Sequence, residues 1–382
     1  MATDPESAAG QRIVEHLAAR LRRRQVVGSR ETALETVLVL RQVVSKARFS
    51  NIDQLVDTIR SVGRKLVEAQ PKGLSTAYTV GNTVRKVLHH IREEYHTATR
   101  GAAAPFPSKP TFSIAKFVSQ GQPRKQTASQ RTSHETRGVL RENDADDPDA
   151  FARALKPVFM EAIQDVLDEL ETVYDNVSKV AKDHIHSDEI ILTIGNSSTV
   201  EAFLKAAASH RKYTCYRSGY CPIVSVVYSG REMAQSLSTS GITTVLVPDS
   251  SVYALMSRIN KVVLGAHAIL ANGGMFAVTG SLLAATAARA HSTPVVVCSG
   301  QFKLTPQWNL YHEYGALDFA DPSGVLGFEE GDLVDKVDVV NPYYDYVRPE
   351  MIDAYITNDG DHPPSSVYRL IKEAYDDEDY EL

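Results

Sequence analysis

The chain has 382 residues, enough for two domains, and 43% of them are hydrophobic, so a core can form without disulfides or metal staples. Its 41 basic and 47 acidic residues give a formal net charge of −6, which provides no general attraction to nucleic acid. Three cysteines (Cys215, Cys221 and Cys298) are too few for a disulfide framework and suit a reducing compartment. No apolar stretch approaches the roughly eighteen residues of a membrane span, and the N-terminal residues do not resemble a secretory signal. We therefore expect a cytoplasmic protein with no membrane or nucleic-acid partner, no metal and no cofactor.

Residues 1–96 carry the spacing of amphipathic helices, with apolar side chains three or four residues apart. Gly28 separates the first two stripes, and Pro71 and Gly73 end the third. The pattern predicts four helices that form an N-terminal helical domain over 1–96. The stripes consist of Ile13, Val14, Leu17 and Leu21; Ala33, Val37, Leu40 and Val44; Leu55, Ile59, Val62 and Leu66; and Val80, Val84, Leu88 and Ile91.

The outer face of the fourth helix is basic: Arg85, Lys86, His89, His90 and Arg92. A solvated helix surface is the ordinary explanation of such a face. The alternative is a docking surface for an acidic partner.

Residues 97–149 are rich in alanine, proline and polar side chains and end in an acidic run, so they cannot bury enough apolar surface to form a core. We expect a flexible linker here, with one apolar island at 112–119 that could pack as a short helix. A long helix is predicted to resume near Phe151 and to connect the two halves over 150–186.

From 187 to 382, short β-branched runs alternate with helical patterns. This alternation predicts parallel βαβ units, and hence a Rossmann-like, doubly wound, mostly parallel sheet. The predicted strands are 189–194, 223–228, 243–248, 261–270, 294–299 and 353–357.

Ligands of such sheets bind at the carboxyl ends of the strands, which directs attention to the turns that follow them. The densest signature is 265–297, where Gly280 and Ser281 could open a helix whose N-terminal amides face an anion. Lys303 could also bind an anion, although a surface ion pair is the ordinary role of such a lysine.

Several blocks of the sequence resemble one known family. They are ILTIGNSSTVEAFLKAA (191–207), VPDSSVYALMSRINKVVLGAHAILANGG (247–274), VTGSLLAATAARAHSTPVVVCSGQFKLTP (278–306) and PPSSVYRLIKEAYDDEDYEL (363–382). These blocks are similar to the regulatory subunits of translation initiation factor 2B, and most specifically to the beta branch of that family. The same superfamily contains methylthioribose-1-phosphate and ribose-1,5-bisphosphate isomerases.

The isomerases show which chemistry to look for. Their pattern has a cysteine where this chain has Gly195, an aspartate at His267 and a lysine at Val278. Because sugar-phosphate isomerisation needs a base or nucleophile, an acid and a charge for the phosphate, we expect no catalysis. His267 is expected to be a hydrogen-bonded turn residue, and the cleft a vestigial ligand pocket. Its candidate residues are Gly195, Asn196, His267, Asn272, Gly273, Gly280 and Ser281.

Two hypotheses follow. The resemblance implies a non-catalytic subunit that pairs with delta, joins the alpha, gamma and epsilon subunits, and helps to bind the alpha subunit of initiation factor 2 and to sense its phosphorylation. A phosphoserine adds nearly two negative charges, so Arg85, Lys86, His89 and Arg92 are the candidate contacts. The alternative hypothesis is a sugar-phosphate isomerase, which predicts the three residues that this chain lacks.

Overall fold

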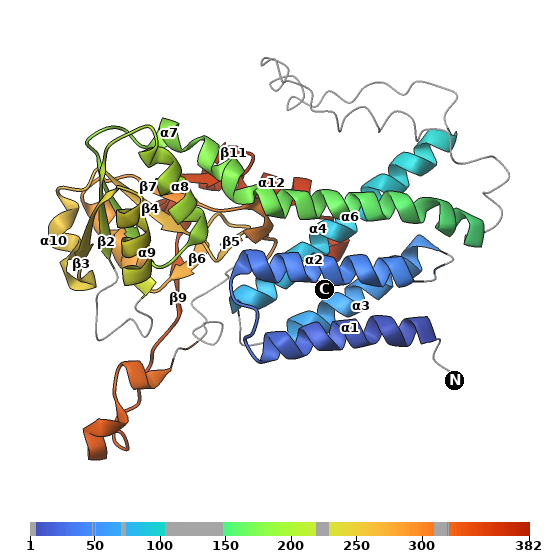
Figure 1. The fold of residues 1–382 in the computed structure, drawn as a ribbon, viewed down its shortest axis with the longest axis horizontal. Helices are drawn as coiled ribbons and strands as arrows, with labels where there is room; N and C mark the ends of the chain where they lie inside the picture. The colour runs from blue at the N-terminus through green and yellow to red at the C-terminus, as the bar shows by residue number, and fades with distance from the viewer. Residues whose placement is uncertain are drawn as a thin grey trace.

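A helical bundle lies beside an α/β unit, and one long helix spans both in the computed structural model (Figure 1). The structure describes residues 5–47, 49, 51–69, 74–103, 148–218, 229–308, 319 and 321–382. The arrangement confirms the predicted fold class, a helical N-terminal region followed by a mostly parallel sheet. Within the described ranges, no helix is long and apolar enough to cross a membrane.

The bundle buries the four predicted apolar stripes, together with one face of the long helix, in a single core. Its helices are α1 (Pro5–Arg22), α2 (Ser29–Lys46), α3 (Ile52–Ala69), α4 (Leu74–Ala103) and α6 (Pro148–Lys179). The long helix ends at Lys179, and a separate short helix, α7 (Ala181–His184), completes the connection to the sheet.

The predicted linker over 97–149 is helical at both ends. Helix α4 continues to Ala103 and α6 already begins at Pro148, so the helical periodicity reaches into both ends of the polar segment. The middle of that segment, with the apolar island at 112–119, lies outside the described residues. The boundaries of the domains stay a prediction.

The main sheet has seven strands in the order β11-β10-β7-β4-β1-β2-β3, and all neighbours are parallel except β10 and β11. Successive residues of each strand point to opposite faces, so Ile191 and Leu192 belong to different cores. The strands are β1 (Ile190–Ile194), β2 (Thr214–Ser218), β3 (Thr243–Val247), β4 (Lys261–Gly265), β7 (Val295–Cys298), β10 (Ala354–Thr357) and β11 (Gly360–His362).

Helices cover both faces of this sheet, as a doubly wound fold requires. One face packs against α7, α8 (Ser198–Ala208) and α9 (Ser229–Thr239). The other packs against α10 (Val252–Met256), α11 (Ser281–Ala290) and α12 (Val367–Ala374).

One strand prediction needs correction, and another falls outside the described residues. The strand beside β1 is Thr214–Ser218, directly after Tyr213, whereas the predicted segment 223–228 lies outside the described residues. The predicted strand 261–270 is two strands, because the chain leaves the main sheet after β4 and enters a second sheet at β5 (Ala268–Leu270).

This second sheet, in the order β8-β5-β6-β9, was not predicted. Its strands contain two to four residues, which is too short for a periodic pattern to stand out. The remaining members are β6 (Met275–Val278), β8 (Leu304–Thr305) and β9 (Tyr344–Val347).

Candidate functional site

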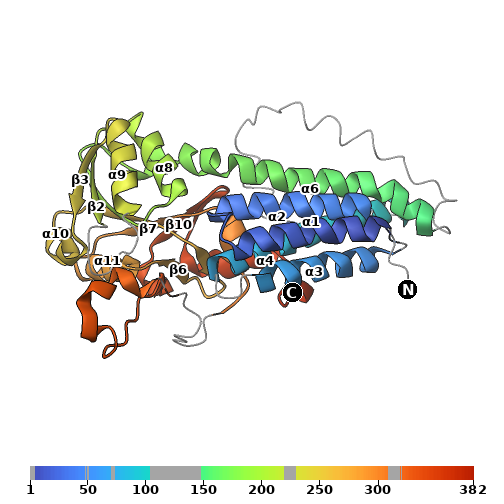
Figure 2. The same cartoon turned by 60° about the horizontal axis from the view of Figure 1, so that its bottom comes forward.

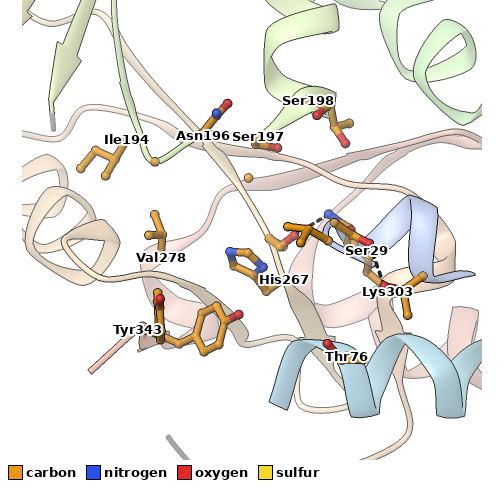
Figure 3. Close-up of a pocket in the computed structure, with 18 of the residues that line it drawn as sticks. Ser29, Thr76, Ile194, Asn196, Ser197, Ser198, His267, Val278, Lys303 and Tyr343 are labelled. Carbon is orange, nitrogen blue, oxygen red and sulfur yellow. Dashed lines mark hydrogen bonds between the residues drawn. The ribbon is translucent and has the colours of Figure 1, made fainter. Parts of the chain in front are cut away.

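The strand order of the main sheet reverses between β1 and β4, and a cavity of about 410 Å³ opens at the carboxyl ends of these two strands (Figure 3). This is where doubly wound sheets place their ligands. One wall comes from the ends of β1 and β4 and the start of α8. The opposite wall comes from the helical bundle, through the α1–α2 turn and Thr76 of α4. The cavity therefore lies between the two halves of the chain.

Gly195 ends β1 with a φ of +70°, a conformation that favours glycine. A Cβ atom added there would lie 2.3 Å from Cγ1 of Val278, which lies next to the end of β1 (Figure 3). Val278 therefore leaves no room for a side chain at this position. The residues that replace the cysteine and the lysine of the isomerases are thus direct neighbours.

Asn196 and Ser197 follow Gly195 and also line the cavity. The Asn196 amide nitrogen lies 3.4 Å from a carboxylate oxygen of Glu232 on α9, and Ser197 caps α8 by accepting a hydrogen bond from the Val200 amide (3.5 Å). Both side chains have local structural partners.

His267 is part of the cavity wall (Figure 3), with its ring edge-on to Tyr344 at a centroid distance of 4.6 Å. Its backbone amide donates to the Phe276 carbonyl oxygen (2.8 Å). Burial and the nearby positive charge of Lys303 lower the pKa of His267 to about 3. The imidazole is therefore neutral at physiological pH and cannot act as a general acid there.

Lys303 is buried in the cavity wall, not paired at the surface as the sequence suggested. Its Nζ donates to the Ala266 carbonyl oxygen (2.8 Å), and burial lowers the pKa of the amine to about 8. The sequence missed its place in the cavity wall, because a single lysine in an irregular segment carries no pattern that predicts burial. It also missed the aromatic residues Tyr174 and Tyr344 and the residues that the helical bundle contributes to the wall.

The N-terminus of α11 does face an anion, and that anion is a side chain of the same chain. One carboxylate oxygen of Asp345, on β9, accepts hydrogen bonds from the backbone amides of Gly280 (2.8 Å) and Leu282 (3.1 Å). Burial raises the pKa of Asp345, and these two amides oppose that shift. Gly280 adopts a φ of +98° at the helix start, and Ser281 is buried beside it. The amides expected to meet a ligand are thus already satisfied.

Asn272 and Gly273 do not line the cavity. They form the turn between β5 and β6, where the Asn272 amide nitrogen donates to the Tyr346 hydroxyl (2.7 Å) and Tyr355 donates to the Gly273 carbonyl oxygen (2.8 Å). Of the seven candidate pocket residues, the structure places Gly195, Asn196 and His267 in the cavity wall; Gly280 and Ser281 open α11 beside Asp345, outside that wall.

The basic face of α4 is covered by the chain's own C-terminal residues, so the expectation that it faces outward is wrong. Arg85 is only 4% exposed, and its guanidinium donates to the backbone carbonyl oxygens of Asp379 (2.9 Å) and Tyr380 (3.0 Å). Lys86 pairs with Glu169 of α6. Whether these residues contact a partner stays a prediction.

Two further basic residues of that face, His89 and Arg92, bind acidic side chains of the same tail. His89 lies 3.2 Å from a carboxylate oxygen of Asp376, and Arg92 donates to Asp376 (2.8 Å) and pairs with Asp379. The Asp379 side chain is fully buried and also accepts from Arg60 of α3 (2.8 Å). We call residues 376–382 the acidic tail; it joins the end of the α/β unit to helices α3 and α4.

The comparisons with known proteins agree with this architecture. Residues 25–364 match the model of the initiation factor 2 subunit family. The chain is 38% identical to translation initiation factor eIF2B subunit beta of Schizosaccharomyces pombe, with 96% of each chain covered. It is 37% identical to the protein of the same name from Dictyostelium discoideum, over 96% of this chain and 95% of that one. Among solved structures, a chain of the tetrameric eIF2B-beta2-delta2 complex from C. thermophilum is similar with a TM-score of 0.65 and 26% identity, over 95% of this chain and 94% of that chain.

Proposed function

Because the chain belongs to the initiation factor 2 subunit family, we propose that it is the beta subunit of initiation factor 2B, a non-catalytic regulatory subunit of a guanine-nucleotide exchange factor. The observation that carries this proposal is the identity of 37–38% to two beta subunits over nearly the whole chain. The chemistry of the cavity and of the neighbouring helix start supports it. Gly195 offers no side chain, and His267 is neutral. The amides that open α11 are occupied by Asp345.

We propose further that the α/β unit pairs with the delta subunit, and that the pair joins the alpha, gamma and epsilon subunits in the cytoplasm. The solved relative that contains beta and delta chains supports pairing of this kind.

A co-expression experiment tests the proposal against the isomerase alternative. We expect the purified chain to form a stable complex with the delta subunit of the same organism. We expect no turnover of methylthioribose 1-phosphate or ribose 1,5-bisphosphate, alone or in the complex. Turnover by the isolated chain would overturn the non-catalytic assignment, and failure to bind delta would overturn the regulatory one.

The finer proposal is that the helical half helps to bind the alpha subunit of initiation factor 2 and to sense its phosphorylation. Lys86, with its neighbours Arg85, His89 and Arg92, offers positive charge for a phosphorylated or acidic partner. Since Arg85 and Arg92 are bound to the acidic tail, the factor would have to displace that tail or approach beside it.

Two variants separate a contact role of Lys86 from its structural role. Lys86→Met and Glu169→Gln both break the same ion pair, but only the first removes a positive charge. If Lys86 contacts the factor, Lys86→Met should weaken binding of the alpha subunit about 10-fold, as expected for loss of one charge-assisted contact, while Glu169→Gln binds normally. Equal affinities of the two variants, measured by titration well below their melting temperatures, would reject the contact.

A further inference from the structure

Residues 321–340 form an arm that leaves the α/β unit just before β9 and extends away from both halves of the molecule (Figures 1 and 2). An isolated bridge between Phe319 and Pro342 closes its base. The arm contains two short 3-10 helices, Pro322–Gly324 and Phe328–Leu333. None of its residues with a described exposure is buried, so the arm adds nothing to the core of its own chain.

The arm is nevertheless rich in apolar side chains. Phe328 is 83% exposed and Val340 is 68% exposed. The other exposed apolar residues are Val325, Leu333 and Val337, with Phe319 at the base. A cluster of this kind on one projection is typical of a surface that another protein covers.

The entropy cost of ordering the arm also indicates that another protein covers it. Ordering one residue costs roughly 1 kcal/mol of backbone entropy, and folding normally offsets this cost by burying apolar surface. Within its own chain the arm buries none of its described side chains, so the compensating contact must come from elsewhere.

The charge of the arm restricts the kind of partner. It carries six acidic residues and one lysine, a formal charge of −5. Two copies meeting arm to arm would bring two such charges together, which is unfavourable. A complementary partner would present an apolar groove rimmed by lysine and arginine side chains.

We propose that the arm is the docking surface for a different subunit of the same family, the delta subunit, which receives Phe328 and Val340 in such a groove. This inference rests on the proposed function, because it names the surface through which the proposed pairing occurs. The solved assembly of beta and delta relatives supports a partner of this class.

The double variant Phe328→Asp, Val340→Asp tests the proposal. Both side chains are exposed, so the isolated variant should melt at the temperature of the wild-type chain. Its affinity for the delta subunit, measured by titration of the two purified chains, should fall by at least about 30-fold, as expected for loss of two central apolar anchors. The matched control is Leu38→Asp, Leu283→Asp, which adds the same charge at exposed apolar positions of α2 and α11 and should change the affinity by less than about threefold.

The outcomes separate the proposed docking surface from the proposed function. If wild type binds delta and the arm variant binds equally well, the arm is not the docking surface while the proposed function stands. If wild type does not bind delta, both fall. If the wild-type chain alone is a dimer that the arm variant dissociates, a second copy occupies the arm and the choice of delta is overturned.

Discussion

Replacing Asp379 with alanine is expected to lower the free energy of unfolding by about 3 kcal/mol, a large effect for a residue of the C-terminal segment. The Asp379 side chain is fully buried, and its carboxylate binds Arg60 of α3 and Arg92 of α4. Without it, two guanidinium groups that are mostly shielded from water lose their main counter-charge.

The size of this effect follows from what each arginine retains. Arg92 keeps Asp376 (2.8 Å) and a weaker contact with Glu378 (3.6 Å). Arg60 keeps only weaker contacts, with Asp57 (3.7 Å) and Glu378 (3.9 Å). The cost should therefore lie at the lower end of the roughly 3–5 kcal/mol expected for breaking a buried ion pair. The backbone of the tail would also loosen, because Arg85 is held by the Asp379 and Tyr380 carbonyl oxygens.

Asp377→Ala is the matched control, since Asp377 belongs to the same tail and its side chain is 69% exposed. It pairs with Lys372 at the surface, where water screens the interaction, so its loss should cost much less than the loss of Asp379. Urea titrations of the two variants, followed by circular dichroism, give the comparison. Equal unfolding free energies would show that the acidic tail does not hold the two halves together.

The elements that the sequence predicts well are those with strong local periodicity. The stripes of α2 and α3 bury the residues that their spacing selects, and β1, β4 and β7 coincide with apolar runs that are buried on both faces. In these segments, the local sequence pattern and the tertiary packing favour the same secondary structure.

Contacts between distant segments are what the sequence does not reveal. The basic stripe on α4 has the pattern of a solvated face, and only the folded chain brings residues 376–382 onto it, nearly 300 positions later. Asp345 is likewise separated in sequence, by 65 positions, from the Gly280 amide that it satisfies. The sequence could therefore identify an anion-binding helix start, but not that the anion belongs to the same chain.

For the site itself, the sequence identifies the altered positions but not their relation. Gly195 and Val278 stand out as two separate departures from the isomerase pattern, 83 positions apart in the chain. In the folded protein, a methyl group of Val278 fills the space that a side chain at position 195 would need. The two departures therefore lie in contact with each other.

The contact between position 195 and Val278 predicts that substitutions at the two positions are coupled in stability. Gly195→Cys should destabilise the protein by about 3 kcal/mol, of which ~1 kcal/mol is backbone strain at positive φ and the rest is overlap with Val278. Val278→Ala alone should cost about 1 kcal/mol, because it removes two methyl groups from a partly buried side chain. In the double variant the overlap is relieved, so its loss should be smaller than the sum of the single losses by at least about 1 kcal/mol.

Gly241→Cys is the control for strain, because Gly241 has a φ of +83° and a Cβ atom there would meet no atom within 4 Å. Its cost should be the strain alone, about 1 kcal/mol. Unfolding free energies of the four variants, measured by urea titration, complete the cycle. Additive losses at positions 195 and 278 would mean that the two residues changed independently. A favourable coupling would mean that a cysteine could return to the end of β1 only after Val278 had been replaced, so a single substitution could not restore the isomerase residue without cost.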